Sequence, residues 1–265
     1  MKIYKIIRLL AFVCVSNISL YAMQTQLSER EINKIASSLN CESCAKLCES
    51  LALIPSEQLK NENLVSSALL VALKKYNKSI LMQDKFKATI LHYTCGCGQN
   101  NLVHIILVAA KMAGDDNLRA LLLAQHNNGS TALHWAALPG AHAECIKENL
   151  QAAKNCNDNY VTLKNLITIT NHLGYNPLHS ACHMAYTECA EALIYEASLI
   201  NDNFSTLKHM LDAKSNQRST ASRLARMRLR TLTRKENSDE KEVLVQEAEQ
   251  CIQVLETACA KSRNY

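Results

Sequence analysis

Residues 131–138 read Thr-Ala-Leu-His-Trp-Ala-Ala-Leu, an apolar run that contains His134 and the only tryptophan of the chain, Trp135. Related stretches occur at Thr89-Ile-Leu-His92 and Asn176-Pro-Leu-His179, and a weaker one at Thr220-Ala-Ser-Arg-Leu-Ala225 lacks the histidine. Their first residues lie 42, 45 and 44 positions apart. A motif that returns at a nearly constant interval indicates a structural repeat. It argues against an active site, which is normally built once.

The residues on both sides of the motif repeat as well. Gly129 and Gly174 each stand two residues before the motif, where a glycine allows the positive φ of a tight turn. Three later segments have the spacing of an amphipathic helix, each with a cysteine at the third position: 143–150, 187–193 and 249–255. The pattern therefore predicts a turn, a first helix and a second helix in each unit.

The motif resembles the ankyrin repeat, whose Thr-Pro-Leu-His-x-Ala signature opens the first of two antiparallel helices after a β-turn. The resemblance covers residues 80–260 and is strongest in the second and third copies. It implies an all-α helical solenoid with short β-turn or hairpin loops and about four repeats, which start near residues 80, 122, 167 and 211. The composition agrees with a helical protein, since 6 Gly, 3 Pro and 5% aromatic residues leave few turn signals.

Each unit is about ten residues longer than the ~33 residues of the family. We expect the additional residues to lie mainly between the second helix and the next turn, as in residues 153–162. An apolar segment precedes each turn, at residues 118–123, 163–167 and 207–211. These segments predict a short extra helical turn that leads into the hairpin.

Residues 23–79 are predicted to form an N-terminal helical cap. Leu64–Tyr76 fits a second helix without the signature, and residues 28–52 are expected to supply the preceding cap helix. Ser28 and Glu31 there have the spacing of a capping box. An atypical sequence is expected at the end of a stack, because one face of the end unit meets water.

Residues 1–22 have the pattern of a secretory signal peptide. Three basic residues precede an apolar run from Leu9 to Leu20, and the small Ala22 offers a cleavage point. The run is short for a membrane span of ~20 residues, although an uncleaved anchor or a first buried helix remains an alternative. Removal of residues 1–22 lowers the net charge from +5 to +2, since three basic and no acidic residues leave. Nucleic acid is therefore not the expected partner, and no membrane span is expected after cleavage.

The resemblance gives the repeated histidine a structural role. In the ankyrin family the motif hydroxyl and the imidazole make hydrogen bonds that fix the junction between turn and helix. Asn176 replaces threonine in the third copy, and asparagine is also a good N-cap. The predicted structural residues are Thr89, His92, Thr131, His134, Asn176 and His179.

The chain contains 12 cysteines, and most follow the repeat. Cys95 and Cys182 stand three residues after a motif histidine, and Cys145, Cys189 and Cys251 share one position in the second helix. Cysteine behaves as a small apolar residue in such places, which predicts reduced core thiols. Equivalent cysteines in neighbouring repeats would lie ~10 Å apart, beyond the ~7 Å limit between disulfide Cα atoms. An exported protein with reduced thiols would be expected to reach a reducing compartment, such as the cytosol of another cell.

Cys41, Cys44 and Cys48 support an alternative reading of the chain as a metal-binding protein or a thiol-based enzyme. Their spacing suits zinc, but no fourth ligand is evident nearby. The same spacing places them on one helical face, as in a core stripe. The Cys-Gly-Cys-Gly stretch at residues 95–98 is a weaker candidate. The chain has no phosphate-binding glycine loop, G-x-S-x-G or H-E-x-x-H motif, so we expect neither an enzyme nor a cofactor.

A basic run extends from Arg218 to Lys235, with seven positive charges and no acidic residue, and an acidic stretch follows it. The simplest interpretation is a pair of antiparallel helices whose charges partly neutralise each other. The alternative is a patch for nucleic acid, an acidic partner or anionic lipid.

The predicted function is protein–protein interaction through the concave face of the solenoid. Resemblance to exported ankyrin proteins of host-associated bacteria suggests a monomeric effector that is secreted or periplasmic, with delivery into a host cell as a further expectation. A structural periplasmic scaffold is an alternative. By family geometry the partner-binding residues are Tyr93, Trp135, Leu138, Ser180, His183, Met184, Asn128 and Leu173, and exposed aromatic side chains are the expected anchors.

Overall fold

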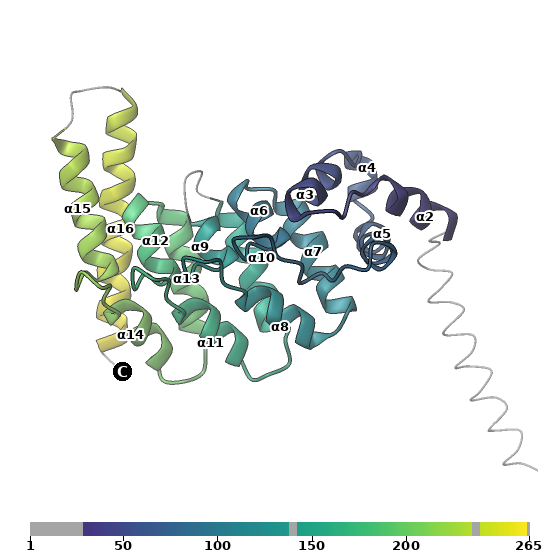
Figure 1. Ribbon diagram of the computed structural model, residues 1–265. Helices are drawn as coiled ribbons and strands as arrows, with labels where there is room; N and C mark the ends of the chain where they lie inside the picture. Colours follow the sequence, from purple (N-terminus) through teal and green to yellow (C-terminus); the bar gives the residue numbers. More distant parts are fainter. Residues whose placement is uncertain (1–28, 138–141, 235–238, 264–265) are drawn as a thin grey trace, which may run out of the picture.

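The computed structural model describes residues 29–137, 142–234 and 239–263. These residues are 69% helical and form no sheet, which confirms the predicted fold class (Figure 1). The predicted signal peptide and Ser28 lie outside the described residues. The helices are α2 (Glu29–Ser38), α3 (Cys44–Ala52), α4 (Ser56–Leu59), α5 (Glu62–Lys75), α6 (Ile90–Gly96), α7 (Asn100–Met112), α8 (Asp115–Leu123), α9 (Ala132–Ala136), α10 (Ala143–Lys154), α11 (Val161–Thr168), α12 (Pro177–Met184), α13 (Thr187–Leu199), α14 (Ser205–Asp212), α15 (Ala221–Thr233) and α16 (Asp239–Arg263).

Three complete repeats stack side by side, and each contains three helices. The first helices of the repeats, α6, α9 and α12, pack on one another as an inner row. The second helices, α7, α10 and α13, form an outer row, and the short third helices, α8, α11 and α14, form another row along the lower edge of Figure 1. Each unit contacts mainly its neighbours in the chain, as in other solenoid proteins.

The third row accounts for the additional length of each repeat. The predicted helical turn is in fact a helix of 8 or 9 residues, and α11 buries Leu163, Leu166 and Ile167. An aspartate three residues before the helix accepts a backbone hydrogen bond from its first turn in two repeats. Asp158 accepts from the Thr162 N–H, and Asp202 accepts from the Thr206 N–H. The shared sequence Asp-Asn-Tyr/Phe-x-Thr-Leu-Lys at residues 158–164 and 202–208 is the signal for this helix.

A tight hairpin turn precedes each inner helix. The residue two positions before the motif has a positive φ in all four copies, namely Lys87, Gly129, Gly174 and Arg218, with values of 64°, 79°, 73° and 57°. Backbone hydrogen bonds join neighbouring hairpins: Asn127 N–H donates to Phe86 O at 2.8 Å, and the next two hairpin pairs are joined at 2.9 and 3.0 Å. The hairpins thus form a continuous strip along the molecule.

Gly129 allows this close approach. A Cβ atom on Gly129 would lie 3.0 Å from the backbone of the next hairpin, at Asn171 Cα and His172 N. Backbone atoms at that distance cannot move aside cheaply, and the φ of +79° already favours glycine. The glycine therefore serves both the turn and the contact between repeats.

The N-terminal region is also helical but differs from the expectation in one respect. Residues 28–52 do not form one cap helix: α2 ends at Ser38 and α3 begins at Cys44. The break has a local cause, because Asn40 Oδ1 accepts a turn hydrogen bond from Glu42 N–H and Ser43 Oγ caps the start of α3. The helix α3 packs on α6 and α5 packs on α7, so these two helices act as a further inner and outer pair, while α2 covers α5.

The C-terminal unit consists of two helices alone, α15 and α16. They pack on each other, and α15 also packs on the inner helix α12. In Figure 1 both stand at the left of the stack and extend above the neighbouring helices. Arg226 of α15 contacts Glu256 of α16 at 2.8 Å. Glu256 lies beyond the acidic stretch of residues 236–249, so neutralisation of the basic run by that stretch stays a prediction.

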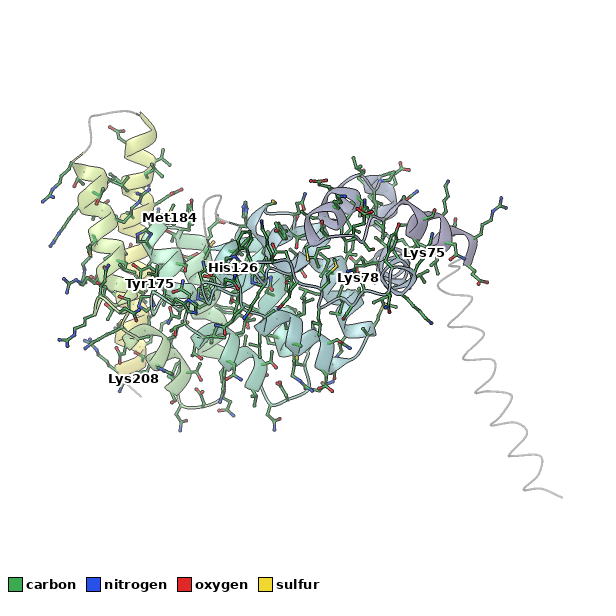
Figure 2. The ribbon with its side chains drawn as sticks, viewed as in Figure 1. Lys75, Lys78, His126, Tyr175, Met184 and Lys208 are labelled. Atoms are coloured by element: carbon green, nitrogen blue, oxygen red, sulfur yellow. The ribbon has the colours of Figure 1, made fainter. Side chains whose placement is uncertain are left out.

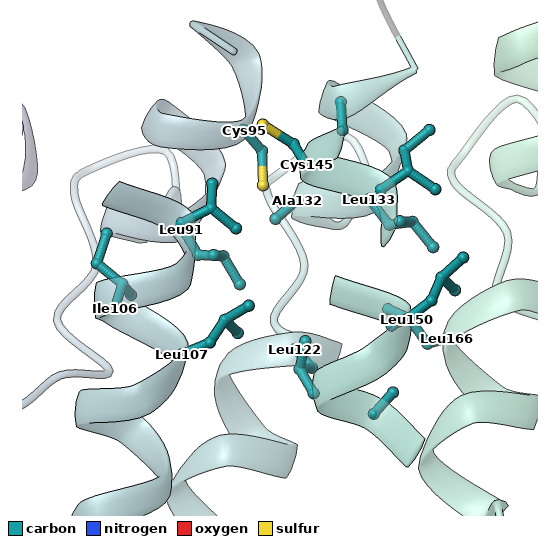
Figure 3. Packing of buried hydrophobic residues seen from close by; sticks show 14 of the residues in the cluster. Leu91, Cys95, Ile106, Leu107, Leu122, Ala132, Leu133, Cys145, Leu150 and Leu166 are labelled. Atoms are coloured by element: carbon teal, nitrogen blue, oxygen red, sulfur yellow. The ribbon is translucent and has the colours of Figure 1, made fainter. Parts of the chain in front are cut away.

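One continuous apolar core runs through all the units. Figure 3 shows its central part, where Leu91, Leu107 and Leu122 come from the three rows of one repeat and Ala132 and Leu133 from the inner helix of the next. Nine of the eleven described cysteines are buried in the protein, whereas Cys97 is exposed. Within the described residues no helix combines the length and the apolar character needed to span a membrane.

Candidate protein-interaction face

The motif histidines link each hairpin to its own inner helix and to the next repeat. In the first repeat, the backbone N–H of Thr89 donates to His92 Nδ1 at 3.2 Å, and Thr89 Oγ1 lies 2.9 Å from the same nitrogen. His92 Nε2 lies 3.1 Å from Ser130 O, a hairpin carbonyl of the second repeat. Since Nδ1 receives a backbone N–H and Nε2 faces a carbonyl, the proton is on Nε2.

The second repeat reproduces this arrangement, and the third keeps the forward contact, although its His179 Nδ1 lies 2.6 Å from the side-chain oxygen Oδ1 of Asn176. His134 Nε2 lies 2.8 Å from Tyr175 O, and His179 Nε2 lies 3.1 Å from Ser219 O. In the third repeat Asn176 is the N-cap, and its Oδ1 accepts from the His179 backbone at 2.9 Å. In the fourth copy Thr220 caps α15 without a histidine.

Burial keeps these imidazoles neutral. Desolvation lowers the pKa of His92 and of His134 to about 4, and it also lowers the pKa of His179. A neutral imidazole fixed by two backbone groups cannot readily take up or release a proton near pH 7. The motif histidines therefore hold the repeats together.

An aromatic cluster lies where the first and second repeats meet. The Trp135 ring packs edge-to-face on His92 at 5.3 Å, His126 at 5.4 Å and Tyr93 at 6.1 Å between ring centroids. Phe86 lies 6.2 Å from His126 and is 49% exposed. Tyr93 and Trp135, which were predicted to contact a partner, are half-buried, so each combines an inter-repeat contact with an exposed edge.

The hydroxyl of Tyr93 is held by the first hairpin. It donates to Asp84 Oδ2 at 2.7 Å, and this hydrogen bond, together with burial, raises the pKa of Tyr93 to about 12. Burial of Asp84 works against its ionisation, but hydrogen bonds from Tyr93 and from the backbone of Ala88 and Phe86 outweigh it and lower the pKa of Asp84. The aromatic cluster is thus fixed in position before any partner binds.

Further predicted residues lie on the neighbouring repeat. Tyr175 contacts His183 at 6.0 Å between ring centroids, and His183 is exposed. Leu173, at the tip of the third hairpin, is 61% exposed. In Figure 2, His126 and Tyr175 follow one another along the long axis of the molecule. Together with exposed Asn128 and partly buried Met184, these side chains extend the surface across two repeats.

The structure contradicts one predicted contact and does not describe another. Ser180 was expected to point outward but is only 5% exposed, because its short side chain does not extend past the helices α9 and α15 that flank α12. Leu138 lies outside the described residues. The predicted surface is therefore made by Tyr93, Trp135, Asn128, Leu173, His183 and Met184, without Ser180.

Phe86 and His126 belong to this surface but were not predicted from the sequence. Phe86 stands three residues before Thr89, the same position that Asn128 and Leu173 occupy in their repeats. Aligning the hairpin of the first copy with the others would have identified it. His126 would not have been identified in this way, because its contact with Trp135 depends on how the two repeats pack.

The cysteine cluster near the N-terminus has the properties of core residues. Cys44 Sγ donates to Met82 O at 3.2 Å, and Cys48 Sγ lies 3.3 Å from Gln99 Oε1, so the thiols are directed to different partners. Burial raises the pKa of Cys44 and of Cys48 to about 11 and also raises that of Cys41. Within the described part of the chain no group of three or more His, Cys, Asp or Glu residues is placed to hold a metal ion.

The basic run forms an exposed face of the terminal helix. Arg223, Arg226, Arg230 and Arg234 recur at helical spacing and are exposed. One of these arginines, Arg226, pairs with Glu256 of the neighbouring helix α16.

Open grooves lie on the outer side of the solenoid. One of about 590 Å³ is bounded by α13, α14 and α16 and includes Tyr195, which is 61% exposed. Another of about 790 Å³ lies between α10 and α13 and is lined by several glutamates. The aromatic cluster belongs instead to the inner side, on the strip of hairpins.

Comparison with known families agrees with this architecture. The family model for ankyrin repeats, in three copies, matches residues 106–204, from the outer helix of the first repeat to the start of the third helix of the third repeat. No curated protein matches the chain. Ankyrin repeats are protein–protein interaction modules and are typically non-enzymatic, so a protein partner is the expected ligand of this fold.

Proposed function

We propose that this protein is an exported ankyrin-repeat module that binds a protein partner through its strip of hairpins and the adjoining ends of its inner helices. The observation that carries the proposal is the aromatic cluster of Phe86, Tyr93, His126 and Trp135, which is preorganised and partly exposed. Rigid aromatic side chains at the centre of a surface are the residues that most often dominate protein–protein binding energy.

The composition of the surface favours a protein over a small molecule. Phe86 and Leu173 present apolar side chains at hairpin tips, and Asn128 and His126 supply polar groups between them. Lys85 Nζ lies 4.9 Å from the Phe86 ring, which adds a cation at the edge. An apolar centre with polar groups around it is typical of a protein interface.

The place of action is the second part of the proposal. The predicted signal peptide of residues 1–22 supports export, and the resemblance to exported ankyrin proteins favours a monomeric effector that binds a host protein. A structural scaffold in the periplasm is the alternative. It differs from the effector in location and in the oxidation state of the cysteines.

The binding proposal is tested with substitutions on the two sides of the solenoid. Protein immobilised at its C-terminus is incubated with eukaryotic lysate, each retained protein is purified, and its binding is titrated. Phe86→Ala and the double variant Tyr93→Ala/Trp135→Ala should weaken saturable binding at least tenfold, whereas Tyr195→Ala on the outer helix α13 should not. Equal binding by all variants would place the interface elsewhere.

A folding control accompanies this experiment, because Trp135 also packs between repeats: a Cβ on Gly96 would lie 3.1 Å from Trp135 Cε3. Far-UV circular dichroism should show unchanged helicity in each variant. If the double variant loses helicity, Phe86→Ala alone decides the result, since Phe86 is half exposed at a hairpin tip.

Export is tested on the protein that the producing cell releases. Mass spectrometry of the secreted fraction should find a mature chain that begins at Met23, after cleavage behind Ala22. A chain that retains Met1 and stays with the cell pellet would contradict export. A mature chain confined to the periplasm would favour the scaffold over the effector.

A further inference from the structure

Two buried cysteines from different repeats are in contact near the C-terminal end. The Sγ atoms of Cys182, on the inner helix α12, and Cys251, on the outer helix α16, lie 3.9 Å apart, and both residues are 0% exposed. The residues are 69 positions apart in the chain. The comparison of equivalent positions in neighbouring repeats does not reveal this contact, because the two cysteines occupy different positions of the repeat.

The geometry follows from how the repeats stack. Cys182 stands three residues after a motif histidine, and Cys251 stands in the shared cysteine position of the outer helix of the next unit. The same two positions meet between the first and second repeats, where Cys95 and Cys145 lie side by side (Figure 3). In the second repeat the residue three positions after the motif histidine is Ala137, so the outer-helix Cys189 of the third repeat has no cysteine at the equivalent place opposite it.

The two cysteine pairs differ in what else holds the sulfur atoms. Cys95 Sγ accepts a hydrogen bond from Asn149 Nδ2 at 3.2 Å. Cys182 and Cys251 instead have each other as hydrogen-bond partners. This contact lowers the pKa of the Cys251 thiol, whereas burial raises that of Cys182.

We propose that Cys182 and Cys251 are a site for an intramolecular disulfide that fastens the last helix, α16, to the third repeat when the protein meets a disulfide oxidant. The Cys251 thiol loses its proton, and its sulfur attacks one sulfur of the oxidant, releasing one thiolate and leaving a mixed disulfide. The Cys182 thiol then loses its proton, and its sulfur attacks the Cys251 sulfur and displaces the second thiol. The two cysteines lose two electrons and two protons in total, and the oxidant is reduced to two thiols.

Access to the site comes from the end position of α16. No further repeat covers the C-terminal unit in the described structure, and the units at the ends of solenoids open more readily than the interior. Local opening of α16 exposes Cys251 to a small disulfide, and closure brings it back to Cys182. Cys95 and Cys145 lie in the middle of the stack, where opening disrupts the packing of units on both sides.

The experiment uses the folded full-length protein with Cys97→Ser, which removes an exposed thiol that could react between molecules. The protein is incubated with oxidised glutathione, denatured, and alkylated, and its peptides are mapped by mass spectrometry. We expect a crosslinked peptide that contains Cys182 and Cys251 and a loss of two free thiols. The thermal midpoint should rise by roughly 5–10 °C and return after dithiothreitol.

Matched variants separate this site from other thiols. Cys182→Ala should abolish both the crosslink and the rise in midpoint, whereas Cys95→Ala should leave both unchanged. Cys182→Ala creates a small change in volume and is expected to fold, and circular dichroism checks this. Cys251→Ala serves as the second variant if the first is unfolded.

Three results would overturn the proposal: no Cys182–Cys251 peptide after oxidation of the folded protein, a Cys95–Cys145 crosslink in preference to it, or glutathione adducts without any crosslink. A crosslink that forms only in urea would also count against it, because the native contact would then play no part.

Discussion

The three central repeats and the C-terminal unit begin with the same hairpin but differ in the residue at the motif histidine position and in what it contacts. In the central repeats the motif histidine bonds forward to a hairpin carbonyl of the next unit, as His134 does to Tyr175. In the C-terminal unit Arg223 occupies the histidine position and is exposed to solvent. The fourth motif is degraded at the point where its forward partner ends, because a buried imidazole without an acceptor for its N–H would be costly. The main role of the motif histidine is thus to bond one unit to the next.

The largest expected effect is an acid sensitivity of the central repeats. Burial lowers the folded-state pKa of His92 and His134 to about 4, below the ~6.5 of an unfolded histidine, so acid protonates the unfolded chain first. The free energy of unfolding should be highest above pH 6.5 and fall as the pH drops toward 4, by roughly 1–2 kcal/mol at pH 5 for His92 and for His134. Urea unfolding at pH 7 and pH 5 measures this, and equal free energies of unfolding would contradict it.

The next effect compares the same motif position in two units. His134→Ala removes the bonds to Thr131 and to Tyr175 O and leaves a cavity, so it should lower the free energy of unfolding by about 3 kcal/mol. Arg223→Ala at the exposed equivalent should change it by less than about 0.5 kcal/mol. Denaturant titrations of both variants measure the two free energies of unfolding. Similar decreases for both variants would show that the histidine hydrogen bonds do not make the central repeats differ from the C-terminal unit.

A third comparison concerns the turn residue. Gly129→Ala places a Cβ against the backbone of the next hairpin at a φ of +79°, and it should destabilise the protein by about 2 kcal/mol. Arg218→Gly relieves a positive φ but adds backbone entropy to the unfolded chain, so its net effect should stay within about 0.5 kcal/mol. Thermal unfolding compares the two variants. A neutral Gly129→Ala would mean that the hairpins can separate at little cost.

The smallest effect lies on the outer row and has the opposite dependence on pH. His104 lies 2.8 Å from both Glu62 of α5 and Glu148 of α10, and these carboxylates raise its pKa although burial opposes them. The stabilisation of the folded protein by these ion pairs is fully present below the pKa of ~6.5 of an unfolded histidine. It is lost as the pH rises through the higher pKa of His104 in the folded protein. His104→Gln should cost roughly 0.5 kcal/mol at pH 6, after screening by solvent, and less at pH 9. A cost that grows with pH would show that the imidazole is not cationic.

Residues with local roles could be predicted from the sequence, and residues that depend on packing between units could not. The turn, the capping residue and the core stripe around His134 follow from spacing along the chain. The burial of Ser180 depends on which helices flank α12, and the break between α2 and α3 depends on the caps at Asn40 and Ser43, which compete with helix continuation. Cys182 and Cys251 are close only because their units stack on each other, so no pattern in the local sequence predicts this contact.

The strip of hairpins gives the array a direction. Each motif histidine contacts a carbonyl of the hairpin that follows it in the chain, and the glycine of the turn lies close to the backbone of that same hairpin. An interior unit therefore depends on the unit that comes after it. A duplicated segment of about 44 residues could therefore be inserted between existing units with every bond preserved. Added behind residue 219, the same segment would meet Arg223 and the long helix α16 in place of an acceptor. Elongation of such a protein during evolution is thus expected to proceed by duplication of units that precede residue 219, with the helices α15 and α16 kept behind them.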